Sequence, residues 1–146
     1  MRKIQPNDLK PAFQFIGTEK DIESHIVDNI EDISAGCGWG VVKSLKTQFT
    51  IRSKSTFYRP DVMIWHSDGS GTVIEVKSTI SNRQSLLSSV SQVLQYGTII
   101  EKKLGAMPRL VIAANEISDD VYDCIKAYKL PINMLMVDGD RCVYLT

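Results

Sequence analysis

The chain has 146 residues, 43% of them hydrophobic and 23% charged, which suits one folded domain and argues against intrinsic disorder. Seventeen basic residues balance seventeen acidic ones, so the basic surplus typical of a stand-alone binder of duplex DNA is missing. No apolar run reaches the roughly 18 residues of a membrane span, and the N-terminus lacks the apolar core of a signal peptide. We therefore expect one cytoplasmic domain over residues 1–146, with no membrane partner.

Cysteine and histidine offer no obvious metal centre. Cys37, Cys124 and Cys142 are far apart and fit no metal-ligand spacing, so buried free thiols are expected. His25 and His66 are too few for a histidine-rich zinc site, and both are expected to be structural or exposed. Carboxylates are therefore the expected ligands of any bound metal.

The first predicted element is a helix. Residues 1–16 are expected to be a loosely structured lead-in. Thr18 and Asp21 form a capping pair, and isoleucines at helical spacing follow at positions 22, 26, 30 and 33. The glycine-rich residues 36–40 end the helix. They lack the Lys-Ser or Lys-Thr of a phosphate-binding loop, so a turn is expected there.

Three strands are expected next. Residues 41–51 are predicted as one strand, and residues 52–58 as a polar, basic connection. Two further strands, at 61–66 and 72–78, are predicted to form a hairpin through a loop rich in glycine and serine.

The remaining pattern predicts helices alternating with strands. A long helix at 84–104 is closed by Gly105. It is followed by a buried strand at 109–114, a helix from Ser118 or Asp119 to about Leu130, and a hairpin of residues 134–137 and 142–145 around Gly139. This order predicts an α/β fold, with a central mixed sheet flanked by helices.

The hairpin at 61–78 is expected to bring charged side chains together. If its loop is centred on Asp68, Asp61 lies opposite Glu75 and Arg59 lies opposite Lys77. Opposed Cβ atoms lie about 5 Å apart, and Glu75 and Lys77 share a face because strand side chains alternate. Solvent-facing charges in an ordinary hairpin would be the alternative.

The apolar neighbours favour a functional site over that alternative. Both faces of the hairpin carry apolar residues, as in a central strand, and buried charges are costly there unless they serve a metal or substrate. Asp61 and Glu75 could chelate one hard cation such as Mg²⁺. Lys77 could orient an attacking water or stabilise developing phosphate charge. Apolar positions on the two faces are Met63, Trp65 and Val73, and Val62, Ile64, Ile74 and Val76.

Arg59-Pro60-Asp61, then thirteen residues, then Glu75-Val76-Lys77-Ser78 resembles the motif of the PD-(D/E)xK nuclease superfamily. This superfamily includes restriction endonucleases, Holliday-junction resolvases and RecB-like nucleases. The resemblance implies a restriction endonuclease-like αβββαβ core, over roughly residues 18–115, with the helix and hairpin at 118–146 added to it. It also implies a DNA endonuclease dependent on Mg²⁺ or Mn²⁺, with Asp61, Glu75 and the Val76 carbonyl as metal ligands and Lys77 as a catalytic residue.

The resemblance suggests further site residues. The first helix of the family often supplies another acid, and Glu19 falls within the isoleucine arc while Glu23 lies at its edge. We therefore prefer Glu19, although a first-turn glutamate also simply favours the helix dipole. Gln92 and Tyr96 share a helix face and resemble the Gln-x-x-x-Tyr motif of RecB-like nucleases. A surface glutamine and a buried tyrosine would be the alternative.

The segment at 43–59 contains five basic residues and no acid, which indicates either a solvated strand face or contact with phosphates. We expect Lys54 and Arg59 to contact the substrate, together with Tyr96. The expected partner is DNA, and a homodimer or a larger complex is expected because cutting a duplex needs two sites. A catalytically inactive DNA-binding or assembly module and an RNA-directed nuclease are the alternatives. The five basic residues are Lys43, Lys46, Arg52, Lys54 and Arg59.

Overall fold

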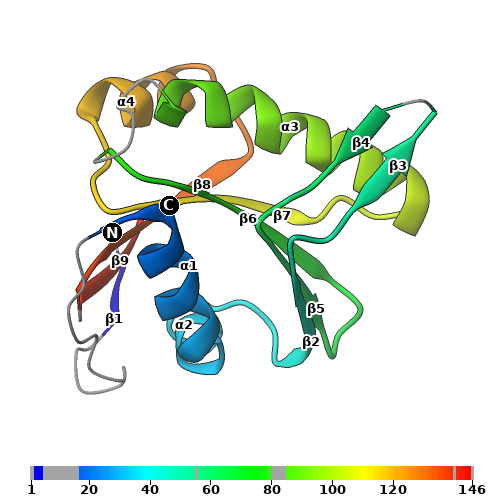
Figure 1. Ribbon diagram of the computed structural model, residues 1–146, viewed down its shortest axis with the longest axis horizontal. Coiled ribbons are helices and arrows are strands. Elements are labelled where there is room, and N and C mark those ends of the chain that lie inside the picture. Colours follow the sequence, from blue (N-terminus) through cyan, green and yellow to red (C-terminus); the bar gives the residue numbers. More distant parts are fainter. Residues whose placement is uncertain (1, 5–16, 55, 80–84, 140, 146) are drawn as a thin grey trace.

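A mixed sheet of seven strands forms the centre of the molecule, with helices on both faces (Figure 1). The computed structural model describes residues 2–4, 17–54, 56–79, 85–139 and 141–145. Helices α1 (Glu19–Asp28) and α2 (Ile30–Cys37) lie on one face, and α3 (Ser85–Leu104) and α4 (Asp119–Ala127) lie on the other. The predicted α/β class, with a mixed sheet flanked by helices, is confirmed.

The three central strands run parallel and the outer pairs run antiparallel. Strands β6, β7 and β8 form the parallel part, and β5, β2, β9 and β1 extend it on the two sides. In order across the sheet, the strands are β1 (Arg2–Ile4), β9 (Arg141–Leu145), β8 (Ile132–Asp138), β7 (Arg109–Ala114), β6 (Gly71–Lys77), β5 (Val62–His66) and β2 (Val42–Thr47).

The first helix begins as predicted but breaks in the middle. Thr18 and Asp21 form the capping box, in which the Thr18 hydroxyl accepts from the Asp21 N–H and the Asp21 carboxylate accepts from the Thr18 N–H. The expected single helix is instead two, because Asn29 leaves helical geometry and donates its amide to the His25 carbonyl oxygen at 2.9 Å. Gly38 ends α2 in the left-handed conformation, at φ 75°.

The hairpin register is confirmed where the two strands pair. Four pairs, from Val62–Ile74 to Trp65–Gly71, follow the predicted alignment, and Gly69 provides the positive φ of +89° that the loop requires. Asp61 lies one residue beyond the last pair of this ladder. The expected pairing of Arg59 with Lys77 was wrong, because the residues just before Arg59 belong to another hairpin.

That second hairpin replaces the predicted basic connection. The strand expected at 41–51 ends at Thr47, because Gln48 takes a left-handed φ of 52°. Strands β3 (Ile51–Ser53) and β4 (Thr56–Tyr58) then form a separate two-stranded sheet beside α3 (Figure 1). Ile51 is buried, and with Tyr58 it packs into the core on the α3 face, which accounts for the turn of the chain away from the main sheet.

The ends of the chain differ in part from expectation. Residues 2–4 of the predicted lead-in form β1, paired with β9, whereas residues 5–16 lie outside the described residues. Ser118 is the N-cap of α4, which ends at Ala127 rather than near Leu130. The C-terminal hairpin around Gly139 is confirmed.

Cys124 is exposed, contrary to expectation, while the other two cysteines are buried. None of the helices in the described part of the chain is both long and apolar enough to cross a membrane.

Strand β6 is covered on both faces, as the apolar pattern of the sequence predicted. Ile74 and Val76 belong to the core under α1 and α2, and Val73 belongs to the core under α3. By alternation, Glu75 and Lys77 project on the α3 face. Two charged side chains are thereby held on a central strand at the margin of the core.

Candidate active site

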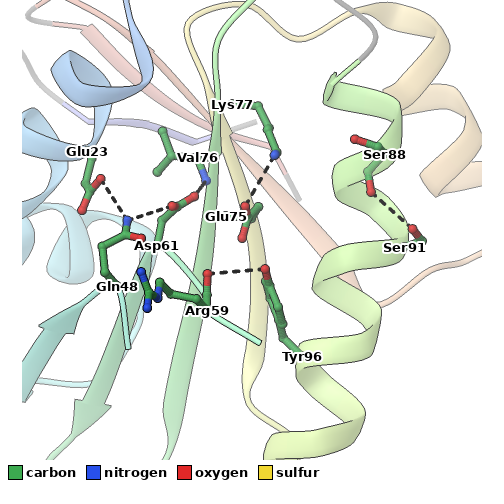
Figure 2. A network of polar contacts seen from close by, with 10 residues as sticks. All are labelled: Glu23, Gln48, Arg59, Asp61, Glu75, Val76, Lys77, Ser88, Ser91 and Tyr96. Atoms are coloured by element: carbon green, nitrogen blue, oxygen red, sulfur yellow. Dashed lines mark hydrogen bonds and ion pairs between the residues drawn. The ribbon is translucent and has the colours of Figure 1, made fainter. Parts of the chain in front are cut away.

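Asp61, Glu75 and Lys77 come together where β5 begins and β6 ends (Figure 2). The peptide N–H of Val76 donates to Asp61 Oδ2 at 2.7 Å, which holds this carboxylate against the edge of β6. The Lys77 Nζ atom lies 3.6 Å from Glu75 Oε1. The three side chains predicted from the hairpin pattern therefore do converge.

Gln48 joins this group from the turn after β2. Its side-chain amide donates to Asp61 Oδ1 at 3.0 Å and to Glu23 Oε2 at 3.5 Å, and its peptide N–H donates to the Asp61 carbonyl oxygen at 2.9 Å. Gln48 thus links α1 to Asp61, just before the start of β5 (Figure 2). No sequence pattern marked this residue, because it lies in what resembles an ordinary surface strand.

Glu75 is almost fully buried, with 5% of its surface exposed. Burial, followed by the negative charge of Asp61, raises the pKa of its carboxyl group to about 8, although the ammonium group of Lys77 opposes the shift. Its Oε2 atom is buried and has no hydrogen-bond partner. A buried oxygen left unpaired costs free energy, so this atom is poised to accept a ligand.

Helix α3 supplies the opposite wall of the site. Tyr96 is buried, its hydroxyl donates a long hydrogen bond of 3.5 Å to the Arg59 carbonyl oxygen, and its ring meets Tyr58 edge-on. Burial, followed by the charge of Glu75, raises the pKa of Tyr96 above its usual value. Gln92 lies one turn earlier on α3, and its Oε1 atom is buried without a hydrogen-bond partner. The structure thus gives Gln92 a buried polar atom, which a purely surface glutamine would not have.

The acid that α1 brings to the site is Glu23 rather than the preferred Glu19. Burial is the largest cause that raises the pKa of Glu23, and the negative charge of Asp61 is the second. The carboxylates of Glu23 and Asp61 therefore lie close together. Glu19 is exposed one turn earlier. A helical wheel gave the direction of these side chains, but it could not show which turn of α1 lies level with Asp61. Arg59 and Lys54 both have exposed side chains.

The donor atoms suit a hard divalent cation. Among the residues that the structure describes, no cluster of three or more acidic, histidine or cysteine side chains encloses a metal position. Two carboxylates are present, however, and Glu75 Oε2 lacks any other partner. Oxygen ligands of this kind fit Mg²⁺ or Mn²⁺, which commonly bind through one or two carboxylates and keep several waters.

Two solved structures with a similar architecture are described as complexes, one with a cyclic nucleotide and one with double-stranded DNA. Can2 from Sulfobacillus thermosulfidooxidans, in complex with cyclic tetra-adenylate, matches with a TM-score of 0.55 and 14% identity, over 84% of this chain and 30% of that chain. The EndoMS–dsDNA2 complex matches with a TM-score of 0.51 and 21% identity, over 82% of this chain and 45% of that chain. The protein has the restriction endonuclease-like fold.

The fold expected from the motif at residues 59–78 is therefore confirmed. This chain spans less than half the length of either solved structure. No protein-family model and no curated protein matches the sequence.

Proposed function

We propose that this restriction endonuclease-like protein is a DNA endonuclease that depends on Mg²⁺ or Mn²⁺. The observation that supports the proposal best is the convergence of Asp61, Glu75 and Lys77, with one buried oxygen of Glu75 left without a partner. Such an arrangement lowers the stability of the metal-free protein, so its presence on a central strand favours a binding role over a structural one.

Asp61 and Glu75 would hold the metal ion, with the Val76 carbonyl as a further ligand. A bound divalent ion polarises a phosphodiester and lowers the pKa of a water molecule. The protein keeps Asp61 ready for this role, because the Val76 N–H and the Gln48 amide each bind one of its carboxylate oxygens. Each oxygen retains a lone pair for a ligand.

Lys77 would place its ammonium group beside the scissile phosphate, where it orients the attacking water or stabilises negative charge on the phosphate.

Gln92 would act from α3, where its unpaired Oε1 can accept a hydrogen bond from a water molecule in the site. Tyr96 would orient Glu75 and the backbone at Arg59. Glu23 would join the site through Gln48, and a direct role for Glu19 stays a prediction.

DNA is the proposed substrate because the EndoMS structure of the same fold holds double-stranded DNA. The exposed side chains of Arg59 and Lys54 would contact the phosphate backbone. Because the whole chain has no net charge, these contacts depend on the local basic segment at 43–59. Cutting both strands of a duplex needs two sites, so we propose that the protein acts as a homodimer or within a larger complex.

Cleavage of supercoiled plasmid and branched DNA, with Mg²⁺ and with Mn²⁺, tests this function. We expect metal-dependent cutting that EDTA abolishes and that Lys77→Ala lowers by about a hundredfold or more. Lys103→Ala, an exposed lysine at the end of α3, is the matched control and should cut normally.

Two outcomes would replace the proposal. If no DNA is cut and calorimetry detects no Mn²⁺ binding, the protein is a non-catalytic module on this fold. If single-stranded or structured RNA is cut while all DNA substrates survive, it is an RNA-directed nuclease.

A further inference from the structure

The β3–β4 hairpin carries an exposed pair of side chains that the fold does not use. Arg52 and Phe57 stand directly opposite each other, and the guanidinium carbon of Arg52 lies 5.0 Å from the centre of the Phe57 ring. Phe57 is 61% exposed, and Arg52 is also exposed. The other face of the hairpin carries Ile51 and Tyr58, which supply its contact with the core. We call Arg52 and Phe57 the hairpin pair.

The hairpin pair lies close to the candidate active site. Phe57 precedes Asp61 by four residues, and an extended chain covers at most about 3.6 Å per residue, so their Cα atoms are within about 14 Å. Tyr58 contacts Tyr96 edge-on, with ring centres 6.2 Å apart, which ties β4 to the wall of the site. Successive nucleotides of a B-form strand are about 3.4 Å apart along the axis, so this distance spans about four nucleotides.

The surroundings of the hairpin pair are basic. Arg52 and Lys54 lie on the hairpin and Arg59 follows it directly, and no acid occurs between residues 43 and 59, although the whole chain is neutral. Between the hairpin and α3 runs a groove whose lining includes Lys54 and Lys102, with no acidic side chain among its described lining residues. An anionic partner complements this surface better than a basic or a neutral one would.

We propose that the hairpin pair stacks on an unpaired base of the substrate, while Lys54 and Lys102 hold the neighbouring phosphates. Bases inside a duplex stack on each other and expose only their edges, so an aromatic ring can cover a base only where a strand is single or opened. The substrate class is therefore DNA in which a single-stranded segment adjoins a duplex. This inference rests on the proposed function, because it assumes that the substrate is DNA.

Fluorescence anisotropy in EDTA separates binding from cleavage. Two labelled probes are needed, a blunt duplex and the same duplex with a single-stranded extension. We expect Phe57→Ala to weaken binding of the extended probe about tenfold and binding of the blunt duplex less than twofold, since stacking on one base is worth about that factor. Arg52→Ala should weaken both, and the extended probe more. Tyr128→Ala is the matched control, because Tyr128 is a 76% exposed aromatic residue outside the hairpin.

The possible results distinguish failure of the stacking surface from failure of the nuclease activity. If Phe57→Ala weakens binding of the extended probe alone, and the wild type cuts no DNA with any metal, the stacking surface is retained and the nuclease is rejected. Equal losses on both probes, no loss, or no DNA binding by the wild type would overturn the stacking surface. A dimer that Phe57→Ala dissociates, seen by sedimentation without a change in DNA affinity, would assign the pair to a protein interface and also overturn it.

Discussion

Replacing Glu75 by glutamine is expected to stabilise the metal-free protein, and increasingly so as the pH rises. The pKa of Glu75 is raised from 4.5 in the unfolded chain to about 8 in the fold, so the fold favours the protonated form. The stability that this proton confers is complete below pH 4.5 and is lost as the pH rises towards 8. Glutamine has a similar shape and is neutral at every pH, so it avoids that loss.

The size of the effect follows from the pKa. From pH 4.5 to pH 7, the wild type loses up to about 1.4 kcal/mol per pH unit through this one group, and about 3 kcal/mol in total because the slope is smaller near pH 4.5. Other titrating groups are shared by the two proteins and cancel in the comparison. For a chain of this size, about 3 kcal/mol corresponds to a rise in melting temperature of roughly 6–12 °C at pH 7, and of about 2 °C or less at pH 5.

The assay is thermal unfolding in EDTA, followed by circular dichroism from pH 5 to pH 8. Glu101→Gln removes an exposed negative charge from α3 and serves as the control. Adding Mn²⁺ should then stabilise the wild type and not Glu75→Gln, because only the wild type retains both carboxylates. A difference in melting temperature that does not grow with pH, or a wild type more stable than the variant at pH 8, would refute the reasoning.

Three further predictions follow from single contacts. Gln48→Ala and Gln48→Gly both remove the amide that holds Asp61, so each should slow cleavage about tenfold. Because glycine suits the positive φ at this position, the Gln48→Gly protein should be about 1 kcal/mol more stable than the Gln48→Ala protein in urea unfolding. Equal stability of the two variants would contradict the backbone argument. Thr18→Ala removes the capping box of α1 and should lower the free energy of unfolding by about 1 kcal/mol, with Thr98→Ala as an exposed threonine control. Tyr96→Phe removes a hydroxyl that lowers the pKa of Glu75, so the loss of stability with pH should extend to higher pH than in the wild type; an unchanged pH profile would count against contact between these residues.

Local patterns in the sequence were sufficient to predict those parts of the fold that depend on residues close together in the chain. The capping box at Thr18, the positive φ at Gly69 and the register of β5 against β6 all depend on residues within one turn or one hairpin. Apolar residues on both faces of β6 identified it as a central strand. The convergence of Asp61, Glu75 and Lys77 could be predicted for the same reason, since alternation and register place side chains within a hairpin.

Contacts between distant segments were decided only by the tertiary structure. Gln48 reaches Asp61 and Glu23 because β2 ends beside α1, and neither partner is near it in sequence. The second half of the basic segment folds into β3 and β4 because Ile51 packs into the core on the α3 face, and α3 begins more than thirty residues later. Whether Glu23 or Glu19 lies level with Asp61 depends on the position of α1 along its own axis relative to the sheet. Periodicity specifies the direction of a side chain from its own element, whereas the packing of whole elements specifies what it meets.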